Sequence, residues 1–149
     1  YGKWAEVLRW MGKEKGYVPV IVGSRDEREA AARIAAEAGG GVVNLAGETS
    51  LKELAALLSL SVFHAGVDSA APHIAAAVGT PVITIYGPTD WRDWAPEGRK
   101  HRVIMPAKDC VPCREKGCRG EGRSECLEEL TAGAVKEAIE EFLSEAHAG

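Results

Sequence analysis

Three side chains that can hold an anion or move a proton stand close together in mid-chain: Asp68, Ser69 and His73. They follow residues 61–67, a short apolar run typical of a buried strand, and they open an alanine-rich run typical of a helix. Ligands of open α/β sheets bind where strands end, and the N–H groups and dipole of a helix start favour phosphate. The spacing therefore predicts an anion site, where the small Ala70 lets the anion approach the backbone closely.

The same residues also have a purely structural interpretation. Asp68 and Ser69 are both common helix N-caps, and His73 can simply fill a gap in the protein. From the pattern alone, both interpretations stay open.

Four cysteines lie within 17 residues in the pattern C-x2-C-x4-C-x7-C: Cys110, Cys113, Cys118 and Cys126. A reducing compartment disfavours two disulfides, whereas four thiolates close in sequence suit a tetrahedral metal ion. The surrounding segment, residues 106–127, is polar and has no hydrophobic period, so a metal ion would order it. We expect a structural zinc ion, with disulfides and free thiols as the alternatives.

The composition excludes several classes of protein. With 149 residues, of which 46% are hydrophobic, the chain can form one domain with a proper core. Eighteen basic residues against 22 acidic ones give a net charge of −4, which disfavours general nucleic-acid binding. No apolar run approaches the ~20 residues of a membrane-spanning helix, so we expect no transmembrane segment.

Strand and helix patterns alternate over residues 17–87, which predicts a parallel sheet with helices on both faces. The expected strands are 18–23, 42–46, 61–67, 81–87 and 101–105. The expected helices are 4–15, 26–38, 50–60, 68–78 and 131–146. Ser50 and Glu53 have the spacing of a capping box. The first helix has no strand before it, so we expect the chain to lack the first strand of its domain.

Residues 68–90, DSAAPHIAAAVGTPVITIYGPTD, resemble the motif of glycosyltransferase family 9, the ADP-heptose:lipopolysaccharide heptosyltransferases. Members show Asp-Ser/Thr-Gly, a His, an Ala-rich helix, Thr/Arg-Pro, a strand and Gly-Pro-Thr/Ser. The resemblance covers essentially the whole chain, and GVDSAAPHIAAA is most similar to the heptosyltransferase III branch. It implies a GT-B fold of two Rossmann-like domains, with residues 1–149 as the C-terminal domain that binds the nucleotide-sugar donor.

The resemblance assigns a role to each matching residue of the predicted anion site. It implies that Asp68, Ser69 and Ala70 contact the diphosphate and the heptose, with His73 beside them. The family usually has glycine where this chain has Ala70, so the backbone approach can differ by the size of a methyl group. Gly87 and Thr89, in the motif Gly-Pro-Thr-Asp, would line the same edge of the cleft.

Two further donor contacts follow from the resemblance alone. Glu27 matches an acidic residue that holds the adenosine ribose, and Thr49 falls where the family contacts adenine. Each has a structural alternative. Glu27 can stabilise a helix dipole by about 0.3–1 kcal/mol, and Thr49 can simply precede the Ser50 cap. Trp91 and Trp94 could wall the ligand or cover the core.

The resemblance implies that the whole protein transfers heptose from ADP-heptose to the inner core of lipopolysaccharide. This would take place in the cytoplasm, at the inner face of the inner membrane. The family's catalytic base and its Lys-x-Trp phosphate loop lie outside this chain, because Lys3 and Trp4 fit the following helix better. We therefore expect no catalytic residue here and no transfer by the chain alone, with the acceptor bound through the missing N-terminal domain.

Helix-start N–H groups and a cationic side chain can stabilise a departing diphosphate, so we expect no catalytic metal. Some relatives carry an iron-bound cysteine finger, which makes iron the alternative to zinc on the four cysteines. The alternative function is a non-catalytic Rossmann-like module that binds a nucleotide or a metal.

Overall fold

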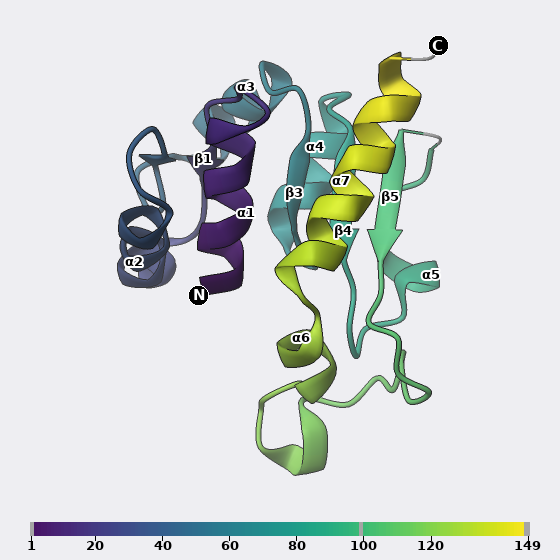
Figure 1. The fold of residues 1–149 in the computed structure, drawn as a ribbon. Helices are drawn as coiled ribbons and strands as arrows, with labels where there is room; N and C mark the ends of the chain where they lie inside the picture. Colours follow the sequence, from purple (N-terminus) through teal and green to yellow (C-terminus); the bar gives the residue numbers. More distant parts are fainter. Residues whose placement is uncertain (1, 99, 148–149) are drawn as a thin grey trace. The chain divides into compact units, whose positions relative to one another are not determined.

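The computed structural model describes residues 2–98 and 100–147, and the chain divides into two compact units, residues 1–54 and 55–149. Both units combine helices with parallel strands (Figure 1). None of the described helices is long and apolar enough to cross a membrane. The α/β class predicted from the alternating patterns is confirmed.

The first unit pairs two helices with a two-stranded parallel sheet. Its elements are α1 (Gly2–Lys13), β1 (Val20–Ile21), η1 (Arg25–Glu27), α2 (Arg28–Ala38), β2 (Val43–Asn44) and the first part of α3 (Leu51–Ser59). α1 buries Val7, Trp10 and Met11, which return to one face at helical spacing, and it packs on α2. Arg9 of α1 donates from Nε to the carbonyl of Ala38 at 3.2 Å, which satisfies an orphan acceptor at the end of α2.

The second unit is built on a three-stranded parallel sheet in the order β3-β4-β5. After α3, its elements are β3 (His64–Val67), α4 (Ala70–Ala77), β4 (Val82–Ile85), α5 (Trp91–Trp94), β5 (His101–Ile104), η2 (Cys118–Gly120), α6 (Glu125–Glu129) and α7 (Ala132–His147). Every residue of β4 is buried, as expected for the central strand of a sheet covered on both sides.

Helices α7 and α4 cover this sheet, with α7 in front of the strands and α4 behind them in Figure 1. The ring of Phe63 lies 5.8 Å from that of Phe142 in α7, and Arg102 of β5 pairs with Glu145 of α7. Ile139, on the same helix, is completely buried. Part of the core of the second unit therefore lies between α7 and the sheet.

The structure refines the sequence expectations at several points. The strands are shorter than predicted and belong to two sheets, one in each unit, where we expected one sheet. The capping box is confirmed: Ser50 N–H donates to Glu53 Oε2 at 2.8 Å, and Glu53 N–H donates to Ser50 Oγ at 3.3 Å. Helices α5 and α6 were not predicted, because four- and five-residue helices carry no readable period.

We expect Ile139→Ala to lower the free energy of unfolding by about 2–5 kcal/mol, since it leaves a cavity beneath α7. Leu60→Ala is the control, because Leu60 is 87% exposed and surface substitutions usually change stability by less than about 0.5 kcal/mol. Equilibrium unfolding in urea measures both variants. Equal losses would contradict the described core.

Candidate functional site

The ends of β3 and β4 meet at one edge of the second unit's sheet. Just past β3, the N–H of Asp68 donates to the carbonyl of Ile85, the last residue of β4, at 3.3 Å. Tyr86, the next residue, donates from its N–H to the carbonyl of Ile104 at 2.9 Å. The start of α4 and the segment of residues 87–90 therefore leave the sheet at the same edge, as the sequence predicted.

The polar side chains at the start of α4 make no side-chain hydrogen bond with the part of the chain that the structure describes. Ser69 occupies the N-cap position in an extended conformation, but its side chain makes no capping hydrogen bond. Ser69 and His73 are exposed and Asp68 is half-buried. Within the described residues, none of these three side chains makes a hydrogen bond or an ion pair. The structure thus gives no support to a structural capping role and leaves all three groups available to a ligand.

The backbone at this helix start suits an anion. The N–H groups of a first helical turn have no intrahelical acceptor, and the helix dipole adds a partial positive charge there. Ala70 is exposed and Ala71 half-buried, so no long side chain covers these N–H groups. Pro72 lacks an N–H but is buried within the turn. The arrangement can therefore bind a phosphate through backbone donors.

Tyr86 adds a hydroxyl that the sequence analysis missed. Its side chain is fully buried, and its Oη has no hydrogen-bond partner among the described residues. Burial, together with the negative charge of Asp68, raises the pKa of Tyr86 to about 12, so the group keeps its proton at neutral pH. A tyrosine that ends an apolar strand is the only sequence signal, because a buried tyrosine hydroxyl usually needs a partner.

Further buried polar atoms lie on the β3–β4 pair. The register places Gly66 beside Thr84, and Thr84 Oγ1 has no partner among the described residues. His64 Nε2 is also without one, and burial lowers the pKa of His64 to about 4. A Cβ on Gly66 would stand 3.0 Å from His64 Nε2, which is a tight contact, so a larger residue there would require the imidazole to shift. His64 is therefore a neutral imidazole in the sheet.

The segment of residues 87–90 is held by contacts with the cysteine-rich segment. Gly87 is buried, and a Cβ there would stand 2.7 Å from Leu127 Cγ, so packing alone accounts for this glycine. Thr89 is half-buried. Asp90 is the N-cap of α5 and accepts from the N–H of Arg92 at 3.1 Å. The donor contacts expected of Gly87 and Thr89 stay predictions.

Two tryptophans follow this segment in α5. Trp94 is 58% exposed, so its ring does not cover the core. Trp91 is half-buried, and the guanidinium of Arg92 lies 5.4 Å from its ring centroid.

Glu27 and Thr49 belong to the first unit. Glu27 Oε2 accepts from the N–H of Ser24 at 2.7 Å and from its hydroxyl at 2.8 Å. These bonds lower the pKa of Glu27 and give the carboxylate a local structural role at η1. Thr49 is half-buried directly before the Ser50 cap. Their contacts with a nucleotide stay predictions.

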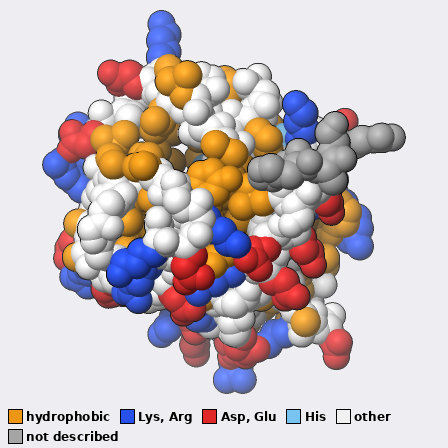
Figure 2. Space-filling view, turned by 45° about the horizontal axis from the view of Figure 1, so that its top comes forward, with side chains coloured by type: hydrophobic (Ala, Val, Ile, Leu, Met, Phe, Trp, Pro, Cys, Tyr) orange, Lys and Arg blue, Asp and Glu red, His pale blue; other side chains and the backbone are white. Residues whose placement is uncertain are grey.

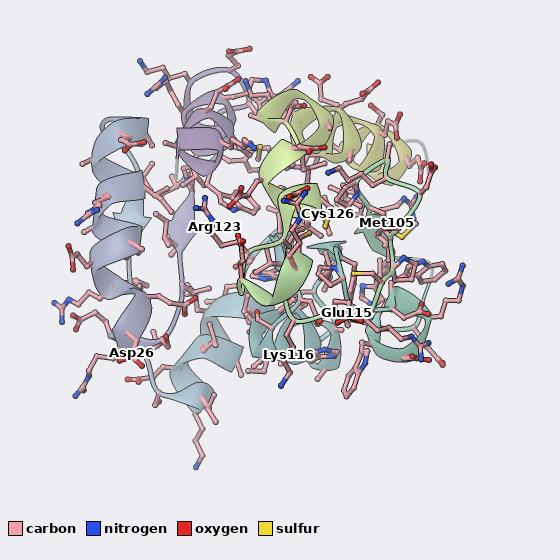
Figure 3. All side chains as sticks on the ribbon, turned by 90° about the horizontal axis from the view of Figure 1, so that it is seen from below. Asp26, Met105, Glu115, Lys116, Arg123 and Cys126 are labelled. Carbon is pink, nitrogen blue, oxygen red and sulfur yellow. The ribbon has the colours of Figure 1, made fainter. Side chains whose placement is uncertain are left out.

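All four cysteines are free thiols: Cys126 is buried, Cys113 and Cys118 are half-buried, and Cys110 is exposed. Burial raises the pKa of the Cys126 thiol, and the other three thiols lie close enough to raise it further. Figure 3 labels Cys126, on the short helix α6, and Lys116, on the loop that precedes this helix. Within residues 2–98 and 100–147, no three His, Cys, Asp or Glu side chains are already arranged to hold a metal ion.

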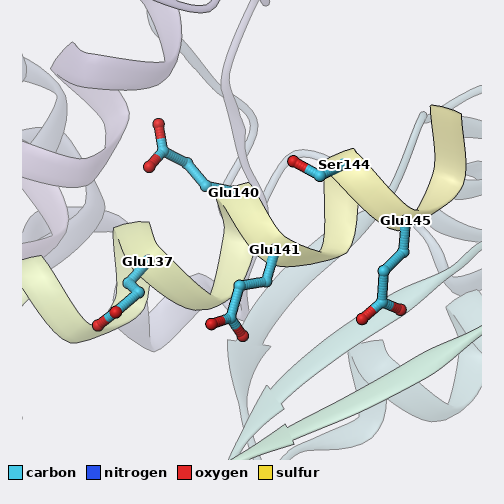
Figure 4. Close-up of a pocket in the computed structure, with 5 residues that line it drawn as sticks. All are labelled: Glu137, Glu140, Glu141, Ser144 and Glu145. Carbon is cyan, nitrogen blue, oxygen red and sulfur yellow. The ribbon is translucent and has the colours of Figure 1, made fainter. Parts of the chain in front are cut away.

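Two other parts of the described surface, the hollow along α7 and the face drawn in Figure 2, show no cluster of positive charge that would attract an anion. A hollow of about 450 Å³ lies along α7 and is lined by Glu137, Glu140, Glu141, Ser144 and Glu145 (Figure 4). Its four carboxylates would repel a diphosphate. On the face drawn in Figure 2, basic and acidic side chains are interspersed. The hollow along α7 is therefore no candidate for an anion site.

Comparison with known proteins adds a family. The model of glycosyltransferase family 9 (heptosyltransferase) matches residues 1–123. Lipopolysaccharide heptosyltransferase 3 of Escherichia coli K12 is 37% identical over 98 residues, which cover 50% of this chain and 28% of that protein. Lipopolysaccharide heptosyltransferase 2 of Salmonella typhimurium is 32% identical over 146 residues, which cover 95% of this chain and 41% of that protein.

A solved structure agrees with these sequence matches. E. coli heptosyltransferase WaaC with ADP is 32% identical and superimposes with a TM-score of 0.71 over 94% of this chain and 38% of its own. The predicted fold class, the Rossmann-like α/β half of a GT-B glycosyltransferase, is confirmed. The chain spans less than half the length of each of these three proteins.

The lowered pKa of His64 predicts a pH dependence of stability. An unfolded histidine binds a proton below about pH 6.5, whereas folded His64 does so only near pH 4. The free energy of unfolding therefore keeps its full value above pH 6.5 with respect to His64. It falls by on the order of 2–3 kcal/mol as the pH decreases towards 4. His101, whose pKa is also lowered by burial, acts in the same direction.

Urea unfolding at pH 7, 6 and 5 measures this loss. The variant His64→Gln should lose clearly less stability over that range than the wild type, with His101 supplying the remainder. An unchanged pH slope in His64→Gln would show that another group causes the effect.

Proposed function

The chain belongs to glycosyltransferase family 9, and from this membership we propose that it is the donor-binding part of a heptosyltransferase. The single observation that carries the proposal lies at the edge where β3 and β4 end: the described residues supply no hydrogen-bond partner to the side chains of Asp68, Ser69 and His73 at the start of α4. WaaC, a relative at 32% identity, was solved with ADP. We assign the α4 start to the diphosphate of an ADP-linked sugar.

The chemistry of each group suggests its part in donor binding. Three kinds of donor at this helix start suit phosphate oxygens: the free backbone N–H groups of α4, the hydroxyl of Ser69 and an imidazole N–H of His73. The carboxylate of Asp68 is an acceptor and would repel phosphate, so it suits the hydroxyl groups of the sugar. The hydroxyl of Tyr86 is a donor held behind this edge. The site thus offers complementary groups to both halves of a nucleotide sugar.

In the proposed reaction, an acceptor hydroxyl attacks the anomeric carbon of the donor while the bond to the diphosphate breaks. The proton of the hydroxyl passes to a base, and the negative charge on the departing ADP grows. The residues of α4 hold that charge with donors fixed before the reaction, which lowers the barrier. The base and the acceptor site belong to the part of the enzyme beyond these 149 residues.

The wider setting follows from the family. We propose heptose as the sugar, the lipopolysaccharide core as the acceptor, and action at the inner face of the inner membrane. The 37% identity with lipopolysaccharide heptosyltransferase 3 over 98 residues supports our assignment to the III branch. A non-catalytic nucleotide-binding module is less favoured, because the relatives are named as transferases.

The donor site is tested by titrating the chain with ADP and following backbone NMR shifts. Ser69→Ala should weaken ADP binding about fivefold or more, because a phosphate donor is lost, while its stability changes little, since Ser69 makes no capping bond. The matched control is Thr131→Ala. Thr131 Oγ1 caps α7 by accepting from the N–H of Ala134 at 3.1 Å.

The control should lose about 0.5–2 kcal/mol of stability and keep its ADP affinity. Asp68→Asn, which keeps the shape of the side chain, should retain ADP binding and weaken the sugar donor more. Ser69→Ala with full ADP affinity would contradict the proposal.

We also propose that the four cysteines bind one structural metal ion, zinc by default and iron as the alternative. The segment around them is irregular: Arg114, Gly117, Arg119, Gly120 and Gly122 all have positive φ. A segment with few buried apolar side chains gains order from a metal bound by four thiolates. The thiols are free, and their spacing begins with C-x2-C. Because no three of the described side chains are already arranged around a metal position, binding requires a local rearrangement of the segment.

Elemental analysis of the purified chain should find about one zinc or iron per molecule. Cys113→Ser should release it and increase amide exchange within residues 106–127 more than in the sheet, which has its own core. Ser124→Ala, in the same segment, should keep the metal. Four titratable thiols and no metal in the wild type would overturn this proposal.

A further inference from the structure

Arg114 joins the cysteine-rich segment to the segment that follows β4. Its Nη2 donates to Asp90 Oδ2 at 2.9 Å and to Asp93 Oδ2 at 3.0 Å. Its backbone N–H donates to the carbonyl of Pro88 at 2.7 Å. One residue thus holds the chain just after β4 through both its backbone and its side chain.

The carboxylate of Asp90 depends on this arginine. The Asp90 side chain is only 11% exposed, and the hydrogen bond from Arg114, followed by that from the Arg92 N–H, lowers its pKa. Oδ1 faces Arg92, whereas Oδ2 faces Arg114. Without Arg114, Oδ2 would be a nearly buried, charged acceptor without that donor, which is costly. The segment would have to move to solvate it.

Two further features show that the contact is specific. Arg114 has φ of +61°, a backbone conformation that L residues other than Asn and Asp rarely adopt, so its surroundings must hold it there. Leu127, at the far end of the cysteine-rich segment, packs directly against Gly87. The cysteine-rich segment therefore grips residues 87–90 at both ends.

We infer that Arg114 is a positioning residue for the donor site: it fixes residues 87–90 beside the start of α4 without taking part in the chemistry. The N–H of Asp68 bonds to Ile85, only two residues before Gly87, so a shift of this segment alters the wall of the proposed site. The inference rests on the proposed function. The cysteine-rich segment, residues 106–127, then has a structural role: it holds one side of the donor site in place.

The test is the ADP affinity of the full chain carrying Arg114→Ala, Arg114→Lys or Arg123→Ala. Arg114→Ala should weaken ADP binding about tenfold, and Arg114→Lys should recover part of the loss, because it keeps one charged donor. Arg123→Ala is the matched control. It removes the same charge from the same segment, where the Arg123 side chain pairs, among the described residues, with the exposed Glu128 alone, and it should bind ADP like the wild type.

A double-mutant cycle separates positioning from a general loss of structure. Because Arg114 acts through Asp90, adding Asp90→Asn to Arg114→Ala should weaken ADP binding little further. Additive losses, or an Arg114→Ala variant with wild-type ADP affinity, would overturn this inference alone. A wild-type chain that binds no ADP would overturn the proposed function instead.

Discussion

The parallel register of β3, β4 and β5 is the constraint on which the candidate site depends. Parallel strands end at the same edge, and the bond from Asp68 N–H to Ile85 ties the end of β3 to the end of β4. The N–H of Tyr86 extends this edge to β5. The start of α4 and residues 87–90 are neighbours for this reason. A loss of this register would separate them, whatever their side chains.

Polar side chains of this chain differ in whether other described residues supply their hydrogen-bond partners. The carboxylates of Glu27 and Glu53 accept hydrogen bonds from their own turns, which lower their pKa. The carboxylate of Asp90 accepts first from Arg114, 24 residues away, and then from the N–H of Arg92, and these bonds lower its pKa. The side chains of Asp68 and Ser69 lie at a helix start as well, yet the described residues offer them no hydrogen-bond partner. This difference, rather than residue type, marks the start of α4 as a place for a ligand.

Sequence periodicity predicted the order of the longer helices and the strands, the parallel pairing of the strands and the position of Asp68. It predicted one sheet, whereas the strands form two. It could not predict the contact of Arg114 with Asp90 or of Leu127 with Gly87. These residues lie in or beside a segment without a period, and their partners are 24 and 40 positions away. The buried hydroxyl of Tyr86 was missed because burial is a property of the folded chain. For Glu27 and Thr49, capping and ligand binding use the same groups, so sequence alone could not decide.

Hydrogen–deuterium exchange of the chain with and without saturating ADP tests the central claim most directly, namely that the diphosphate binds at the start of α4. The account predicts slower exchange of the N–H groups of Ala70 and Ala71, which an anion would bond. It predicts a smaller effect in residues 87–90 and none along the acidic face of α7. Bound ADP that leaves exchange at the start of α4 unchanged would contradict the account.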